Sequence, residues 1–259
     1  MEKKDFTWES TTNDLQVNNI NAAMISIGAT EQCGPCLPFH IDTLLAELYA
    51  RHFGQAISAY ILPTLPFNTS EEHTKFRGTV SVTPVNLMNF LENIVVCLRK
   101  QGFVKQAITG GHGGAYWFSS FIKYINHKYE DMVLVSAHCG ADKSWNQGLK
   151  EAGLKEYADT HSEIHGGLIS KCIALYLCPD LVREGRFGQN IDRDLGSFID
   201  YGVWHKIAKD GCWGDSGDMN EGNEILREKG KILLETFLEL QVEFFKEHFK
   251  KACELKGIS

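Results

Sequence analysis

The sequence of 259 residues has no long run of basic residues, and its formal net charge is −7. Proteins that bind nucleic acids or anionic membranes depend on clustered Lys and Arg, so we expect neither as a partner. No stretch reaches the ~18 apolar residues of a membrane-spanning helix. The first ten residues, MEKKDFTWES, lack the apolar segment of a signal peptide. We therefore expect a cytoplasmic protein.

The chain also lacks internal repeats, low-complexity tracts and linkers rich in Pro, Gly or Ser. With 43% hydrophobic and 23% charged residues, its length is sufficient for one sizeable α/β domain with a substantial core. We therefore expect a single domain over residues 1–259. In a cytosolic location, the eight cysteines are expected to be thiols or ligands rather than disulfides.

Short apolar segments alternate with helical patterns along the chain. Buried strands are expected at residues 22–28, 59–65, 104–110 and 132–138. Helices are expected at 42–54, 83–102, 115–128 and 166–178, with a long amphipathic helix at about 221–253. This alternation predicts an α/β fold in which a mostly parallel sheet carries helices on both faces.

Polar residues collect directly after each predicted strand. In chain order they are Glu31, Cys33, Cys36, His40 and Asp42, then Asn68 to His73, then Gly110 to Gly114, then His138 and Cys139. Sites in open α/β sheets form at the carboxyl ends of the strands. Because several loops bring His, Cys, Glu and Asp to one edge, the sequence predicts a metal site there.

The CGPC segment at residues 33–36 matches the dithiol of thioredoxin-like redox enzymes, but its surroundings do not. Pro38 disfavours helical backbone before it, so a helix is expected to begin near Asp42, with Cys33 in an extended loop. A redox cysteine needs a helix N-terminus to lower its thiol pKa. The nearby carboxylate of Glu31 raises a thiol pKa instead, unless a shared cation is present.

The GGHGG segment at 110–114 fits neither G-x-G-x-x-G nor G-x-x-x-x-G-K-[ST]. Its glycines allow the backbone to approach a site into which His112 projects. Glu31 and Cys33 fall on the same side of an extended segment, and with Asp42 they form a candidate metal cluster.

His161, Glu163 and His165 alternate ahead of a Gly-Gly pair. Taken alone, this pattern is typical of a solvated turn that leads into a helix.

Four segments, in order, resemble the creatininase family. GATEQCGPCLPFHIDTLLAE (28–47) resembles its Glu-Gln-His-Gly-Pro-His-Leu-Pro run and Thr-Asp pair, and SEEHTKFRGTVS (70–81) its Ser-x-Glu-His…Gly-Thr block. TGGHGGA (109–115) resembles its Asn-Gly-His-Gly-Gly-Asn loop, and 163–182 its His-Gly-Gly segment with the helix that follows. The resemblance implies a three-layer α/β/α sandwich, a homo-oligomer that is often a hexamer, and metal-dependent hydrolysis of cyclic amides, formamides or small peptides.

By this resemblance, Glu31, Asp42 and His112 are the ligands of one divalent metal, and Asp42 bridges to a second. Cys33 stands where the family has a His that binds the second ion. A thiolate also suits Zn²⁺, so Zn²⁺ is the favoured ion, with Mn²⁺ as the alternative and one or two ions per subunit.

The resemblance also assigns catalytic roles to His165 and Glu31. Four residues are expected to contact the substrate: Ser70, His73, His161 and Glu163. His161 stands where creatininase has a Trp that stacks on the substrate, so creatinine is expected to be a poor substrate.

Two positions depart from the family pattern. Relatives supply a Glu to the second metal from positions that here hold Gly114 and Leu168.

The leading interpretation of the function is hydrolysis of a C–N bond in a small cyclic amide, formamide or related amide by a metal-activated water. A second is a catalytically decayed, metal- or ligand-binding homo-oligomer. The least favoured is a dithiol oxidoreductase that uses Cys33 and Cys36.

Overall fold

A four-stranded parallel sheet lies at the centre of the computed structural model, which describes residues 5–161, 163–185, 188, 191–214 and 221–258. The strand order is β2-β1-β3-β4. The strands are β1 (Ala22–Ile27), β2 (Tyr60–Ile61), β3 (Lys105–Gly110) and β4 (Val133–Ser136). β1 pairs with β3 along its whole length, from Ala22 opposite Lys105 to Ile27 opposite Gly110. The predicted α/β class is confirmed.

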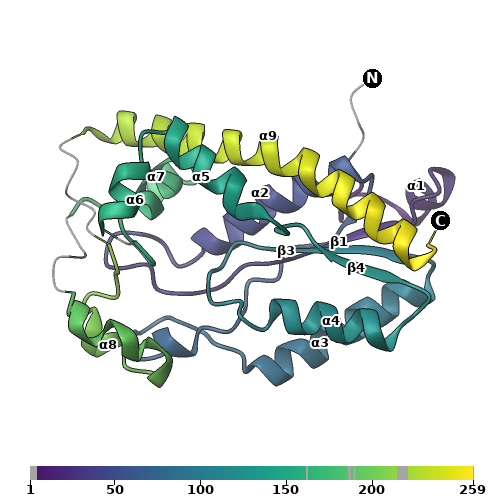
Figure 1. The fold of residues 1–259 in the computed structure, drawn as a ribbon, viewed down its shortest axis with the longest axis horizontal. Coiled ribbons are helices and arrows are strands. Elements are labelled where there is room, and N and C mark those ends of the chain that lie inside the picture. Colours follow the sequence, from purple (N-terminus) through teal and green to yellow (C-terminus); the bar gives the residue numbers. More distant parts are fainter. Residues whose placement is uncertain (1–4, 162, 186–187, 189–190, 215–220, 259) are drawn as a thin grey trace.

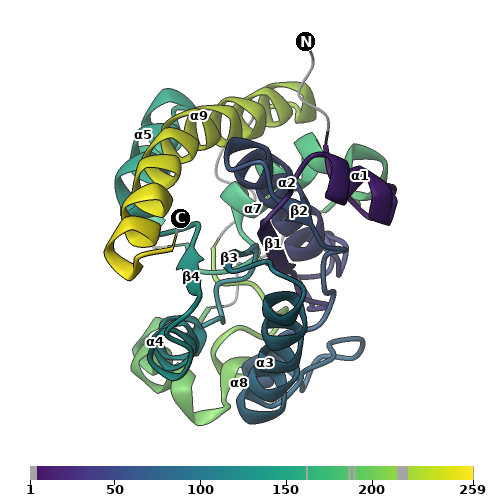
Figure 2. The same cartoon turned by 90° about the vertical axis from the view of Figure 1, so that its right-hand side faces the viewer.

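Helices cover both faces of the sheet (Figure 1). One face carries α2 (Ile41–Ala56), α5 (Ala141–Glu151), α7 (Leu168–Leu177) and the long α9 (Asn223–Lys256). The opposite face carries α3 (Pro84–Lys100) and α4 (Phe118–Lys128), as Figure 2 shows from the side. Shorter elements complete the described chain: α1 (Thr12–Val17), η1 (Glu71–His73), α6 (Lys155–His161), η2 (Pro179–Leu181), η3 (Arg193–Tyr201) and α8 (Trp204–Ile207). None of the described helices is long and apolar enough to cross a membrane.

Each face of the sheet has its own hydrophobic core. All six residues of β1 are buried, as expected for a central parallel strand. Because side chains alternate along a strand, Met24 packs into the core under α2 and α9, whereas Ile25 packs into the core under α3 and α4. The sheet is therefore packed on both faces, and its strands fix the positions at which the site loops begin.

α9 is joined to the sheet by a buried polar side chain. Gln241 is fully buried and donates hydrogen bonds of 3.0 Å to the carbonyls of Ala137 and Cys139, just after β4. Its side-chain oxygen accepts a 3.0 Å hydrogen bond from the hydroxyl of Ser144 in α5. One amide therefore links α9, α5 and the end of β4.

The sequence did not predict α5, and its composition explains why. Only three of its eleven side chains are apolar, Ala141, Trp145 and Leu149, so the stripe that packs on the core is narrow. A Cβ at position 148 would lie 2.7 Å from the carbonyl oxygen of Leu233 in α9. Besides this narrow stripe, the helix packs on α9 through the close approach of two backbones at Gly148, a contact that a hydrophobic pattern does not reveal.

Candidate metal centre

The loops that leave the carboxyl ends of β1 and β3 meet above the sheet, where the strand-end pattern predicted a site. Glu31 follows β1, His112 follows β3, and Asp42 lies in the first turn of α2. A cavity of about 520 Å³ opens there. Its lining includes nine carboxylate, imidazole and thiol side chains: Glu31, Cys33, Asp42, Glu72, His73, His112, Glu163, His165 and Asp200.

Glu31 occupies the centre of this arrangement and is only 2% exposed. Among the described residues, neither carboxylate oxygen accepts a hydrogen bond of good geometry, and its nearest imidazole nitrogens, on His73, His112 and His165, lie 3.4 to 3.5 Å away. Burial raises the pKa of Glu31 to about 8. A buried carboxylate with only such long contacts is unfavourable unless a cation compensates it. The chemistry of this side chain therefore fits a bound metal ion.

Glu31, Asp42 and His112 form the first of two groups whose ligand atoms all lie within 4.8 Å of one another. His112 Nδ1 lies 3.2 Å from Asp42 Oδ2, and its Nε2 lies 2.7 Å from the carbonyl oxygen of Thr69. Burial lowers the pKa of His112, but Asp42, Glu31 and the Thr69 carbonyl outweigh burial and raise the pKa to about 10. A proton on His112 thus supplies the positive charge that these carboxylates require, and a metal ion would supply the same charge.

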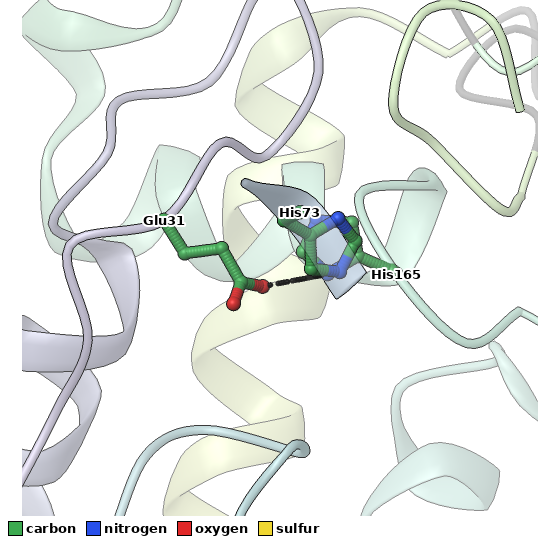
Figure 3. Close-up of side chains that lie close together, drawn as sticks. All are labelled: Glu31, His73 and His165. Carbon is green, nitrogen blue, oxygen red and sulfur yellow. Dashed lines mark ion pairs between the residues drawn. The ribbon is translucent and has the colours of Figure 1, made fainter. Parts of the chain in front are cut away.

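Glu31 also belongs to the second group, with His73 and His165 (Figure 3). Glu31 Oε1 lies 3.4 Å from His73 Nε2 and 3.5 Å from His165 Nδ1. The two imidazole rings stack with their centroids 4.3 Å apart. Burial lowers the pKa of both histidines, that of His73 to about 2. At neutral pH both rings are therefore uncharged.

Cys33 lines the cavity but belongs to neither group. Burial, followed by the charge of Asp42, raises the pKa of its thiol well above the usual range. The thiol of Cys36 donates a 3.6 Å hydrogen bond to the carbonyl of Glu184, and both cysteines are free. A raised thiol pKa is the opposite of what a redox dithiol requires.

Glu163 lines the cavity, but its carboxylate also anchors the start of α7. Oε1 accepts hydrogen bonds from the backbone N–H groups of Gly167 and Ser170 and from the Ser170 hydroxyl, at 3.0 to 3.1 Å. Oε2 accepts one from the N–H of Ile169 at 2.9 Å. A carboxylate at a helix N-terminus is stabilised by the helix dipole. This structural role was absent from the sequence prediction, which expected substrate contact alone.

The prediction for His161 stays a prediction. The residue ends α6, and its side chain lies outside the part of the chain that the structure describes.

The sequence reasoning missed the aromatic wall of the site. Trp204 packs edge-on against the His73 ring at 4.6 Å and against the His165 ring at 5.8 Å. Glu72 also lines the cavity. Trp204 lies far along the chain from the other site residues and follows no motif, so the sequence held no signal for it.

Comparison with known proteins identifies the family of this chain. The family described as Creatininase: Creatinine amidohydrolase matches residues 4–245. The chain is 24% identical to a creatinine amidohydrolase of Pseudomonas putida, over 87% of this chain and 89% of that protein. It is also 24% identical to a mycofactocin precursor peptide peptidase of Mycobacterium ulcerans, over 63% of this chain and 61% of that protein.

Solved structures show the same fold. A creatininase crystal structure aligns with a TM-score of 0.68 at 18% identity, covering 95% of this chain and 98% of that one. A manganese form of creatininase aligns with a TM-score of 0.68 at 19% identity, covering 95% and 99%. With a family match over nearly the whole chain and these structural neighbours, the chain belongs to the creatininase family.

Proposed function

We propose that this chain is a metal-dependent amidohydrolase that cleaves a C–N bond in a small amide substrate. The observation that carries the proposal is the buried carboxylate of Glu31, which accepts no hydrogen bond of good geometry among the described residues and belongs to both groups of side chains that could hold a metal. Zinc and manganese forms are known among the structural neighbours, which supports a divalent cation. The proposed ion is Zn²⁺, with Mn²⁺ as the alternative.

Glu31, Asp42 and His112 would hold the first ion, because three protein ligands leave a coordination position open for water. A divalent cation held there lowers the pKa of a coordinated water and polarises a substrate carbonyl. The hydrogen bond from His112 Nε2 to the Thr69 carbonyl orients the ring and leaves Nδ1 beside Asp42 as the ligand atom. Cys33 lines the same cavity, and we propose it as a ligand of a second ion.

His165 is the proposed proton carrier. Its ring lines the cavity and is held by a 2.7 Å contact between Nε2 and the main-chain oxygen of Gln32. Its Nδ1, which lies beside Glu31, could take a proton from the attacking water and then pass it to the leaving nitrogen of an amide. Ser70 and His73, buried beside Glu31, would shape the part of the pocket that receives the carbonyl group.

The cavity extends beyond the metal-ligating groups. A neighbouring hollow of about 520 Å³ shares Glu72, Tyr116, Asp200 and Trp204 with it. This space is larger than a single small ring requires. It favours an extended amide, such as a short peptide, as a second substrate class, and the mycofactocin peptidase relatives support that class. Creatinine remains the weaker candidate.

The test begins with elemental analysis of protein purified without added metal and without a His tag. We expect at least one divalent ion per chain, and His112→Ala should lose most of it because one of three ligands is removed. Full occupancy in the variant would show that the site has been placed wrongly. The metal-loaded chain is then assayed against creatinine, formamides and dipeptides. Stoichiometric metal without turnover of any of them would favour the decayed, ligand-binding alternative.

Glu31→Gln should abolish turnover while the fold survives. An amide supplies only a dipole where the cation needs a charge, and a strand-end loop contributes little to the core. Circular dichroism controls for folding, and undiminished turnover with intact metal content would contradict the role of Glu31.

We further propose that the chain forms a homo-oligomer, a hexamer by family resemblance. Light scattering would test this assembly.

A further inference from the structure

The side-chain amide of Gln32 contacts both stacked histidines, His73 at 2.8 Å and His165 at 3.2 Å, and the residue is 5% exposed. Its amide has one orientation only, because main-chain groups hold both ends. Oε1 accepts a 2.8 Å hydrogen bond from the N–H of Gly34, and Nε2 donates at 2.9 Å to the carbonyl of Gly211. Reversing the amide would place donor against donor and acceptor against acceptor. The atom that faces the histidines is therefore the nitrogen.

The surroundings are shaped to receive this amide. Position 211 requires glycine for two reasons. A Cβ there would lie 2.0 Å from Gln32 Oε1, and the backbone has a φ of +89°, which other residues rarely adopt. Trp204 donates a 3.0 Å hydrogen bond from its indole N–H to the same Gly211 carbonyl. The Gly211 carbonyl therefore holds both the Gln32 amide and the Trp204 ring, which packs edge-on against both histidines.

This orientation decides where the proton of His73 lies. Gln32 Nε2 has two hydrogens, and one is used by Gly211. The second points to His73 Nδ1, 2.8 Å away. Nδ1 must then accept, so the ring proton is on Nε2, which faces Glu31 Oε1 at 3.4 Å.

His165 has the same tautomer for a different reason. Its Nε2 lies 2.7 Å from the main-chain oxygen of Gln32, which only accepts, so Nε2 carries the proton. His165 Nε2 also lies 3.2 Å from Gln32 Nε2. This contact is not a hydrogen bond, because both nitrogens are donors and their hydrogens are directed at other acceptors. His165 Nδ1 is left bare and lies 3.5 Å from Glu31 Oε1.

We propose that Gln32 is a positioning residue that holds both histidines as Nε2–H tautomers. In the group shown in Figure 3, only His165 then offers a bare nitrogen to the cavity, whereas His73 directs an N–H at Glu31. A metal ligand must present a lone pair, so this group is not a second site with three ligands. A role for these tautomers in catalysis rests on the proposed function, whereas the tautomers themselves rest on the hydrogen bonds alone.

The direct test is ¹⁵N spectroscopy of the full chain labelled at its histidines, with metal removed by a chelator, at neutral pH. The ring-nitrogen shifts of His73 and His165 are assigned with His73→Gln and His165→Gln. We expect a bare Nδ1 and a protonated Nε2 on both rings. A proton on Nδ1 of either ring would overturn the inference.

Gln32→Glu supplies a second spectroscopic test. The substitution places a carboxylate oxygen where the amide donated to His73 Nδ1, so this nitrogen should gain a proton. His165 should not change, because its partner is the main chain of residue 32 and survives the substitution. A His73 spectrum unaffected by Gln32→Glu would contradict the assignment.

Two variants of His73 separate a hydrogen-bond donor from a metal ligand. His73→Leu, which has no N–H, should weaken zinc affinity by about 10–100-fold, as is typical when a group that orients a ligand is lost. His73→Gln keeps an N–H and should recover most of that affinity. An equal loss of bound zinc in both variants would identify His73 as a ligand and refute the inference. If the unmodified chain binds no metal, the proposed function fails, and the ring-nitrogen spectra still decide the tautomers.

Discussion

Gly111 is the position where one added methyl group would move a proposed metal ligand. A Cβ there would lie 2.1 Å from the carbonyl oxygen of Asp42 and 2.7 Å from the backbone nitrogen of Ala46. Both atoms belong to the first turns of α2, so no flexible side chain can yield. The Gly111 N–H is bonded to the Ile27 carbonyl at 3.2 Å, which keeps the loop on the sheet. In Gly111→Ala, α2 must therefore move away.

The size of this movement follows from the contact. Ordinary van der Waals contact begins at 3.4 Å, so the start of α2 must shift by 3.4 − 2.1 = 1.3 Å. Overpacking of this kind destabilises a fold by about 1–3 kcal/mol, and for a chain of this size each kcal/mol lowers Tm by about 2–4 °C. Displacing Asp42 from His112 should also weaken zinc binding by about 10–100-fold, the typical effect of disturbing ligand orientation.

The measurements are thermal unfolding by circular dichroism in the presence of a chelator, and zinc titration by calorimetry. Gly113→Ala is the matched control, because a Cβ at position 113 meets no atom within 4 Å. We expect the control to retain both Tm and zinc affinity. Unchanged values in Gly111→Ala would refute the reasoning. Equal losses in both variants would show that loop flexibility, rather than the contact with α2, is responsible.

Three further predictions concern buried polar groups. Gln241→Leu leaves the Ser144 hydroxyl and two main-chain carbonyls without a partner, so the free energy of unfolding should fall by about 2–4 kcal/mol, as measured by urea denaturation. Burial lowers the pKa of His138 from 6.5 to about 4. Between these values only the unfolded chain binds this proton, so stability should decrease as pH falls, by about 1.4 kcal/mol per pH unit. His138→Gln should reduce that slope in urea titrations, and an unaltered slope would contradict the assignment. Finally, Cys33→Ala should weaken binding of a second zinc ion and Cys36→Ala should not, and equal effects in metal titrations would exclude Cys33 as a ligand.

The central strands and the long helices were predictable because their signals are local. A strand covered on both faces requires a continuous apolar run, and β1 and β3 lie within the predicted segments. The second strand was expected at 59–65 but contains only Tyr60–Ile61. Pro63 cannot donate a hydrogen bond, which limits regular pairing at this edge of the sheet.

The first group of candidate metal ligands could also be predicted from the sequence. Parallel strands place their carboxyl ends at one edge, so Glu31, Asp42 and His112 could be expected to meet once the strands were recognised. The resemblance to the creatininase family identified the same three residues, and the structure brings their ligand atoms together.

Only the tertiary structure decided the second group and its hydrogen bonds. His73 and His165 come from segments far apart in the chain, and their stacked rings both contact Gln32 and Trp204. Glu163 could not be identified as a helix anchor either, because its partners are backbone N–H groups that converge only once α7 has formed. Hydrophobic periodicity records which face of an element is buried. Tautomers and caps depend instead on single donor and acceptor atoms, which distant parts of the chain bring together only in the folded protein.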